Sequence, residues 1–135
     1  MQAICLYKGS NCMKKIYSAV IVLAALSLGA CAGPPAKMEG GALTGATNMT
    51  LYTFDRDTAG SGKSVCNGPC ANNWPALIAS DRAKPYGEYT IIMRDDGRKQ
   101  YAYQGKPLYY FAKDQKPGDK LGDGFLNGAW HTAKQ

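Results

Sequence analysis

Apolar and polar positions divide the 135-residue chain into an apolar N-terminal segment and a C-terminal part with short, strand-like runs. Residues 16–30 are almost all apolar or small and follow the basic segment Met13-Lys14-Lys15. Further along, apolar and aromatic residues gather in short runs at residues 49–54, 88–94, 98–104, 108–111 and 129–133. Runs of this kind, bounded by glycine, proline and aspartate, are typical of β-strands. The pattern therefore predicts a mainly β domain, built as a small antiparallel sheet, behind an N-terminal targeting segment.

Two turn signals join the middle strands of this domain. Asp95-Asp96-Gly97 separates two of the runs, and Asp-Gly accepts the positive φ that a hairpin turn needs. Residues 104–107 supply a second turn, so three consecutive strands should form an antiparallel meander. One short helical turn is predicted over residues 69–74, because Pro69 suits the first turn of a helix.

The N-terminal segment has the composition of a secretory signal. A basic stretch, an apolar run of 15 residues and the small pair Gly29-Ala30 follow one another, which is the order found in signal peptides. We therefore expect residues 1–30 to be a signal peptide whose true start is Met13. The apolar run is shorter than the roughly 20 residues of a membrane-spanning helix.

The end of this signal resembles the lipobox of bacterial lipoproteins, in the tetrapeptide Leu28-Gly29-Ala30-Cys31. The resemblance implies that Cys31 carries acyl chains such as palmitate, several of which anchor a protein stably where one does not. Ala32 stands where inner-membrane retention would favour aspartate, so in a host with an outer membrane we expect that membrane, on its periplasmic face. An ordinary signal peptide with a chance cysteine is the alternative.

Charge and composition after the signal narrow the possible partners. Beyond residue 30 the chain has 13 Lys or Arg and 10 Asp or Glu, a net charge of +3, which is too small and too mixed to indicate a nucleic-acid partner. Twelve aromatic residues outnumber ten Val, Ile and Leu, so we expect an aromatic-rich core. Residues 32–47 are dominated by Gly, Pro, Ala and Thr, which predicts a flexible, lipid-anchored tether over 31–47 and a β domain over 48–134.

The cysteines within the domain, Cys66 and Cys70, flank Asn67-Gly68-Pro69. In an exported protein a disulfide is the default, and Gly68-Pro69 supplies the turn that brings two such cysteines together. The alternative is a redox or copper-handling site that adds His131, the single histidine of the chain, because two thiolates and an imidazole suit a soft metal.

An internal repeat organises the domain. Tyr52-Thr-Phe54-Asp-Arg-Asp57 matches Tyr109-Tyr-Phe111-Ala-Lys-Asp114 at an offset of 57 residues, and each copy is followed by a glycine-rich loop and a tryptophan, Trp74 or Trp130. Tyrosine and phenylalanine two residues apart lie on one face of a strand. The aspartates fall where the strands should end, where they can accept backbone N–H groups and fix a turn. A catalytic pair of carboxylates is the less favoured reading of Asp57 and Asp114.

These residues resemble the bacterial secreted-repeat lipoproteins defined by the motif Yx(FWY)xxD, a family of unknown function. Both copies of the motif match in full, and so do Cys66-x-Gly68-x-Cys70 with Trp74-Pro75 and Tyr103-x-Gly105-Lys106-Pro107. The resemblance covers residues 48–134 and implies an exported or lipid-anchored protein. It leaves the molecular function open.

The sequence carries no catalytic signature that we can identify, such as a nucleophile elbow, a P-loop or HExxH. We therefore expect a protein that is not an enzyme and needs no cofactor: a binding or structural module whose partner is an envelope protein or polymer. Thiol or copper handling by Cys66, Cys70 and His131 is the alternative. Exposed aromatic residues, Trp74 and Trp130 among them, would favour a carbohydrate polymer.

Overall fold

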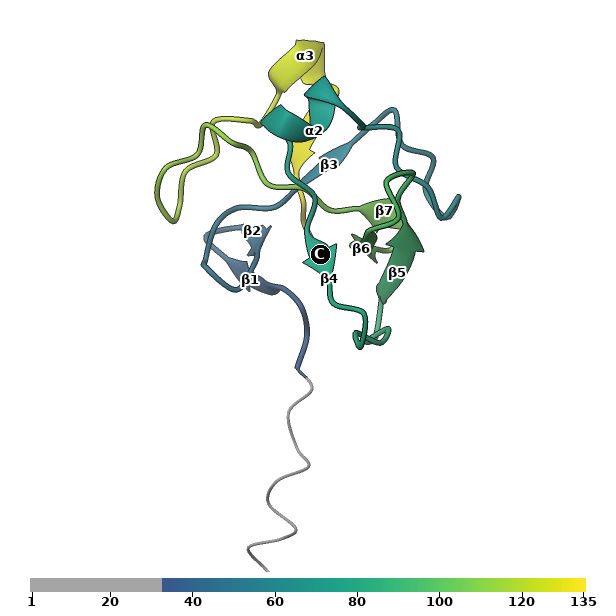
Figure 1. Cartoon of the computed structure of the whole chain (residues 1–135). Helices are drawn as coiled ribbons and strands as arrows, with labels where there is room; N and C mark the ends of the chain where they lie inside the picture. The colour runs from purple at the N-terminus through teal and green to yellow at the C-terminus, as the bar shows by residue number, and fades with distance from the viewer. Residues whose placement is uncertain (1–32) are drawn as a thin grey trace, which may run out of the picture. The chain divides into compact units, whose positions relative to one another are not determined.

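The computed structural model describes residues 33–135 (Figure 1). The predicted signal peptide, its start at Met13 and the lipidation site Cys31 lie outside these residues. In chain order the elements are β1 (Lys37–Glu39), β2 (Ala42–Thr44), β3 (Tyr52–Phe54), α2 (Pro69–Asn73), β4 (Ile78–Ala79), β5 (Tyr89–Met93), β6 (Lys99–Tyr103), β7 (Lys106–Pro107), α3 (Phe125–Gly128) and β8 (Trp130–Thr132). Within the described part, no helix has both the length and the apolar character that crossing a membrane requires.

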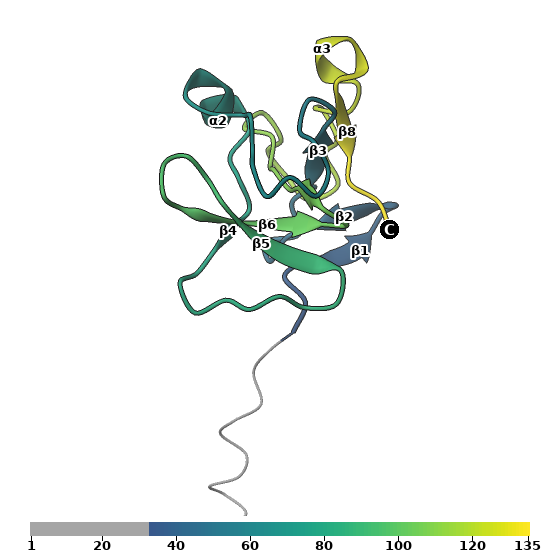
Figure 2. The same ribbon diagram turned by 90° about the vertical axis from the view of Figure 1, so that its right-hand side faces the viewer.

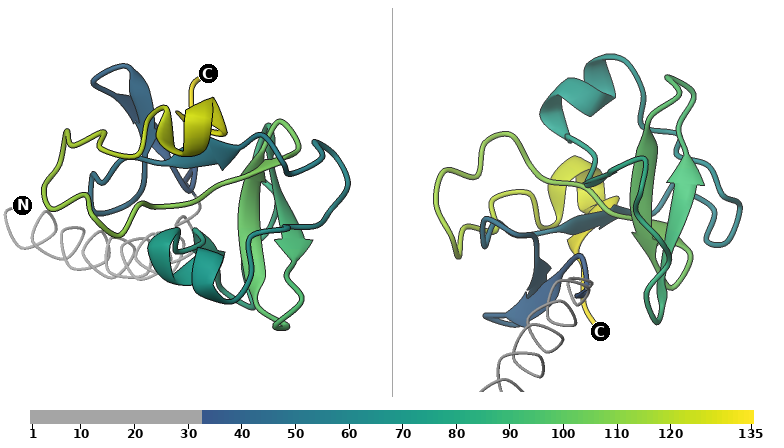
Figure 3. Two further views of the ribbon diagram at one scale, coloured as in Figure 1. Left: turned by 90° about the horizontal axis from the view of Figure 1, so that it is seen from above. Right: turned by 60° about the horizontal axis from the view of Figure 1, so that its bottom comes forward.

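The strands pair antiparallel, which confirms the predicted fold class. β5 and β6 form the expected hairpin, with Tyr89 opposite Tyr103 and Met93 opposite Lys99. The third strand of the meander, β7, lies within the predicted turn over residues 104–107 and not at 108–111, and β4 also pairs with β6. Asp95-Asp96-Gly97 makes the predicted turn between β5 and β6, where Gly97 has a φ of 82°. The β1–β2 and β5–β6 hairpins belong to separate sheets (Figures 1 and 3).

The prediction of a flexible tether up to residue 47 is wrong. Residues 37–44 form the β1–β2 hairpin, and Ala42 and Leu43 are fully buried. Leu43 donates a backbone hydrogen bond to Ala133 and accepts one from Leu51. These partners come from distant parts of the chain, so a local excess of glycine and alanine does not reveal the hairpin.

The prediction of a regular strand over residues 108–111 is also wrong. Tyr109 forms isolated bridges to Tyr52 and to Ala76, and Tyr110 donates its N–H to the carbonyl of Pro75. Because Pro75 has no N–H to return, the ladder stops there. In the corresponding pair, β3 and β8, His131 lies opposite Thr53 and the ladder continues.

The two short helical elements of the described part, α2 and α3, lie at the same end of the domain (Figures 1 and 2). α2 confirms the predicted helical turn, with Pro69 at its first position. α3 was not predicted, and Leu126 and Asn127 within it have left-handed backbone angles.

The buried hydrophobic side chains of residues 33–135 form two clusters. One gathers leucines with tyrosines and small residues near the hairpins, including Leu43, Leu51, Leu77, Leu108 and Tyr103. The other is aromatic and contains both motif copies together with Cys66, Trp74 and Trp130. The aromatic-rich core predicted from composition is thus present, and both tryptophans belong to it.

Candidate functional site

The two motif copies meet in a stack of four aromatic rings. Trp74 and Trp130 lie face to face with centroids 3.7 Å apart and an angle of 2° between their planes. Phe54 stacks on the outer face of Trp130 at 4.1 Å, and Phe111 stacks on Trp74 at 4.3 Å. Each tryptophan therefore stacks on the phenylalanine of the other motif copy. The tryptophans are 3% and 1% exposed, so a carbohydrate platform built on them is ruled out.

The motif tyrosines pack on the sides of this stack. The Tyr52 ring meets Trp74 edge-on at 5.4 Å, and the Tyr109 ring meets Trp130 edge-on at 5.1 Å. The backbones of the two tyrosines exchange hydrogen bonds, with N to O distances of 2.7 and 3.0 Å. The two motif copies therefore make corresponding contacts with each other, as expected for two related repeats.

Each tyrosine donates its hydroxyl to the aspartate of the other motif copy. Tyr52 Oη lies 2.6 Å from Asp114 Oδ2, and Tyr109 Oη lies 2.5 Å from Asp57 Oδ2. Burial, followed by these hydrogen bonds to carboxylates, raises the pKa of both phenols well above the ordinary value. Both hydroxyls therefore stay protonated and keep their role as donors.

The second oxygen of each aspartate fixes the loop that follows its own strand. Asp57 Oδ1 accepts the N–H of Val65 at 2.8 Å, and Asp114 Oδ1 accepts the N–H of Leu121 at 3.0 Å. The predicted structural role of the aspartates is thereby confirmed. The tyrosine and aspartate of the motif therefore tie each repeat to the other and to its own loop.

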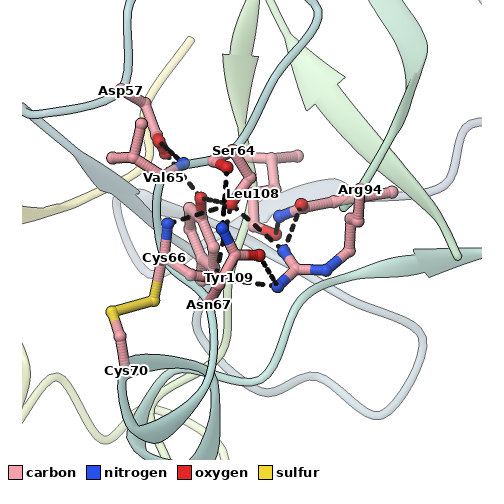
Figure 4. The surroundings of a disulfide bond; sticks show 10 residues. Asp57, Ser64, Val65, Cys66, Asn67, Cys70, Arg94, Leu108 and Tyr109 are labelled. Atoms are coloured by element: carbon pink, nitrogen blue, oxygen red, sulfur yellow. Dashed lines mark hydrogen bonds between the residues drawn. A yellow bond between two sulfur atoms is a disulfide. The ribbon is translucent and has the colours of Figure 1, made fainter. Parts of the chain in front are cut away.

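A buried arginine at the end of β5 contacts the loop of the first repeat, and the loop of the second repeat has no such partner among the described residues (Figure 4). Arg94, at the end of β5, is 2% exposed. Its guanidinium donates to the Cys66 carbonyl at 2.7 Å, to Gln100 Oε1 at 2.7 Å and to Ser64 Oγ at 3.2 Å. Ser64 in turn bonds the Tyr109 hydroxyl at 2.7 Å. No local pattern in the chain indicates this network, because its members come from separate elements.

The cysteines form the predicted disulfide, with their Cα atoms 5.2 Å apart (Figure 4). Cys66 is fully buried in the aromatic cluster, and α2 carries Cys70. The bond therefore fastens α2 to the core just before Trp74. This placement fits a loop clip, and it ties up two of the three side chains required by the copper-handling alternative.

His131 lies on the exposed face of β8. Its Nε2 shares a hydrogen bond of 2.8 Å with Asp55 Oδ2. Among residues 33–135, no group of three His, Cys, Asp or Glu side chains could hold a metal ion. The structure thus gives the copper-handling alternative no supporting geometry.

Two surface hollows border the buried side chain of Tyr103. The first, which we term the tyrosine groove, has a volume of about 500 Å³ and is lined by Tyr86, Tyr89, Tyr103, Glu88, Met38, Lys37, Pro34, Ala36, Gly87 and Gln135. The second, which we term the histidine pocket, measures about 200 Å³ and is lined by His131, Asp55, Lys106, Lys134, Gln104, Tyr103, Thr53, Thr132 and Ala133. Apart from His131, the lining residues were not predicted as site residues, since a surface hollow depends on which loops meet.

The sequence matches a protein family described as a secreted repeat of unknown function, over residues 36–78 and again over 90–134. The chain belongs to this family. The first match begins at β1, which agrees with the structural start of the domain and again places it before residue 48. No curated protein and no solved structure matches the chain. Membership in a secreted family indicates a location in the cell envelope or outside the cell.

Proposed function

We propose that this protein is a non-enzymatic binding module of the cell envelope, held there by acyl chains on Cys31, whose tyrosine groove takes a saccharide polymer. The lipobox-like sequence before Cys31 and the membership of a secreted family support the location. The buried pairing of Asp57 and Asp114 with tyrosines supports a role other than catalysis.

The observation that carries the binding proposal is the composition of the tyrosine groove. Tyr86 is 45% exposed, while Tyr89 and Tyr103 are buried, and the centroids of the latter two rings lie 4.9 Å apart. The exposed ring of Tyr86 provides apolar area with a polar tip, which suits a sugar ring that is apolar on its faces and polar at its edges. Glu88 adds a carboxylate that accepts the Tyr103 hydroxyl at 2.8 Å and keeps further acceptor capacity.

A second feature of the groove supports a ligand that carries hydroxyl groups. The Tyr89 hydroxyl is buried and has no hydrogen-bond partner among residues 33–135. A buried polar group without a partner costs about 1–3 kcal/mol, so such groups are uncommon in folded domains. A ligand hydroxyl would supply the missing bond if rotation of the Tyr89 side chain brought its hydroxyl into the groove.

Binding is tested by affinity electrophoresis of the purified domain, residues 33–135, in gels containing dextran, polygalacturonate or phosphomannan. We expect at least one polymer to retard the domain, and Tyr86→Ala to abolish the retardation, because Tyr86 is the exposed ring of the groove. The matched control is Phe125→Ala, which removes an equally exposed ring, also 45%, that does not line the groove. Migration unaffected by every polymer, or equal retardation of wild type and Tyr86→Ala, would contradict the proposal.

Anchoring is tested on the full chain in cells grown with labelled palmitate. We expect label in the wild-type protein and none in Cys31→Ser, because acylation requires the thiol. Cys66→Ser is the matched control, since Cys66 forms a disulfide within the domain, and it should keep the label. Normal labelling of Cys31→Ser would contradict the assignment.

A further inference from the structure

The histidine pocket has the charge pattern of an anion site. Lys106 follows the turn after β6, and Lys134 follows β8; both line the pocket with His131. Among the described residues, neither lysine has a carboxylate oxygen within 4.0 Å, whereas Asp55 is engaged by His131 at 2.8 Å. Two lysines without a carboxylate partner among the described residues therefore line a pocket whose single lining carboxylate is already paired.

The remaining lining groups suit an oxyanion as well. Gln104 and Thr53 carry neutral polar side chains that can donate hydrogen bonds. Hydrogen bonds between a charged acceptor and ammonium groups are about twice as strong as neutral ones. The pocket volume of about 200 Å³ accommodates a carboxylate or phosphate group, since a water molecule occupies about 30 Å³ of liquid.

Tyr103 connects this pocket to the proposed saccharide site. Its side chain lines both the tyrosine groove and the histidine pocket. A sugar in the groove would therefore lie next to the pocket that Lys106 and Lys134 line.

We infer that the histidine pocket binds the anionic group, carboxylate or phosphate, of an acidic saccharide whose ring is held in the tyrosine groove. The inference rests on the proposed function and adds the chemical class of its ligand. Lys106 and Lys134 supply the attraction, while Asp55, which shares a hydrogen bond with His131, disfavours binding of the anion.

The lysines are tested with the double variant Lys106→Gln/Lys134→Gln. We expect it to weaken retardation by polygalacturonate or phosphomannan about tenfold, since exposed ion pairs contribute up to about 1 kcal/mol each. Retardation by dextran, which is neutral, should not change. The control Lys84→Gln/Lys113→Gln removes two exposed lysines that do not line the pocket and should leave both kinds of polymer unaffected. Equal effects of the two double variants would overturn the inference.

A variant of Asp55 tests the charge of the pocket separately, because stronger polymer binding is not expected from a loss of structure. Asp55→Asn removes the carboxylate that opposes the anion, so it should strengthen binding of the acidic polymers by about threefold. Weaker binding by this variant would overturn the assigned role of Asp55. The polygalacturonate and phosphomannan arms distinguish a carboxylate from a phosphate as the recognised group.

A titration followed by NMR separates this inference from the proposed function. Inorganic phosphate and galacturonate should shift the ring resonances of His131, and galactose, the neutral sugar, should not. Anion-dependent shifts without retardation by any polymer would leave the anion site in place and contradict the saccharide-binding function. Retardation by dextran alone, with no shift of His131 by either anion, would overturn the anion site and leave the groove function standing.

Discussion

The two repeats make the same motif contacts with each other, but their loops are held in different ways. In both, the motif tyrosine reaches the aspartate of the other copy, and the tryptophan stacks on the partner tryptophan. The loop between aspartate and tryptophan is closed in the first repeat by the Cys66–Cys70 bond and by Arg94. The second repeat has neither, and its loop ends in the left-handed turn of α3. The motif positions thus fix the pairing of the halves, whereas the loops are free to vary.

Gly122 shows how closely the second loop approaches the shared core. A Cβ at this residue would lie 2.6 Å from Cη2 of Trp74 and 3.1 Å from a ring carbon of Phe111. The first loop places the side chain of Cys66 in the same aromatic cluster. The absence of a side chain at Gly122 and the disulfide in the first loop are therefore alternative ways to seat a loop against the stack.

The largest effect is expected from breaking the stack at either end. Phe54→Ala and Phe111→Ala should each lower the free energy of unfolding by about 3–5 kcal/mol, because each ring is almost fully buried against a tryptophan. Urea unfolding followed by tryptophan fluorescence measures this loss. A difference of more than about 2 kcal/mol between the two variants would contradict the equivalence of the halves.

The next largest effect is expected from removing either hydrogen bond between a motif tyrosine and the aspartate of the other copy. Tyr109→Phe and Tyr52→Phe should each cost about 1.5–3 kcal/mol, because each removes a hydrogen bond to a buried carboxylate. Tyr109→Phe should be the more costly, since its second bond, to Ser64 at 2.7 Å, is shorter than the bond of the Tyr52 hydroxyl to the Gly122 N–H at 3.3 Å and leads to the Arg94 network. Tyr86→Phe, which removes an exposed hydroxyl, is the control in the same urea assay. A larger loss for Tyr52→Phe would show that the Arg94 network does not reinforce the first loop.

Local patterns predicted the parts of this fold that are held by local forces. The β5–β6 hairpin follows from alternating residues around Asp95-Asp96-Gly97, and α2 follows from Pro69. The disulfide follows from spacing and a turn between its cysteines. In each case the signal and the structure lie within a few residues of each other.

Contacts between distant segments were beyond the reach of these patterns. β1 and β2 have three residues each, too few for an alternation to stand out, and Leu43 is buried by partners such as Ala133. The repeat located Asp57 and Asp114, but not the fact that each binds the tyrosine of the other copy. Arg94 reads as an ordinary surface residue at a strand end until the fold carries it to the Cys66 carbonyl.

The disulfide should contribute less than the motif contacts. Reduction with the cysteines left in place should lower the free energy of unfolding by about 2 kcal/mol, the value expected when so short a ring is opened. The β fold should persist, because the second repeat seats Trp130 without any cysteine. Circular dichroism with and without reductant, followed by urea unfolding, measures both effects. Cys66→Ala/Cys70→Ala, in which reductant should change nothing, is the control, and global unfolding on reduction would contradict the clip.

The smallest effect is a dependence of stability on pH that arises at Asp57. Burial raises the pKa of this carboxyl above its ordinary value near 4, and the hydrogen bonds from Tyr109 and Val65 and the charge of Arg94 oppose that rise. Between the ordinary and the raised value, the folded protein keeps a proton that the unfolded chain has released. The free energy of unfolding should therefore fall as the pH rises through this window, whereas the contribution of Asp57 is fully present below it.

Urea unfolding at a series of pH values from 3 to 7 should show this decline reduced in Asp57→Asn. Asp96, whose pKa is lowered chiefly by the backbone N–H of Arg98, produces the opposite slope in both proteins and cancels in the difference. Parallel curves for wild type and variant would show that the hydrogen bonds and Arg94 fully offset the burial of Asp57.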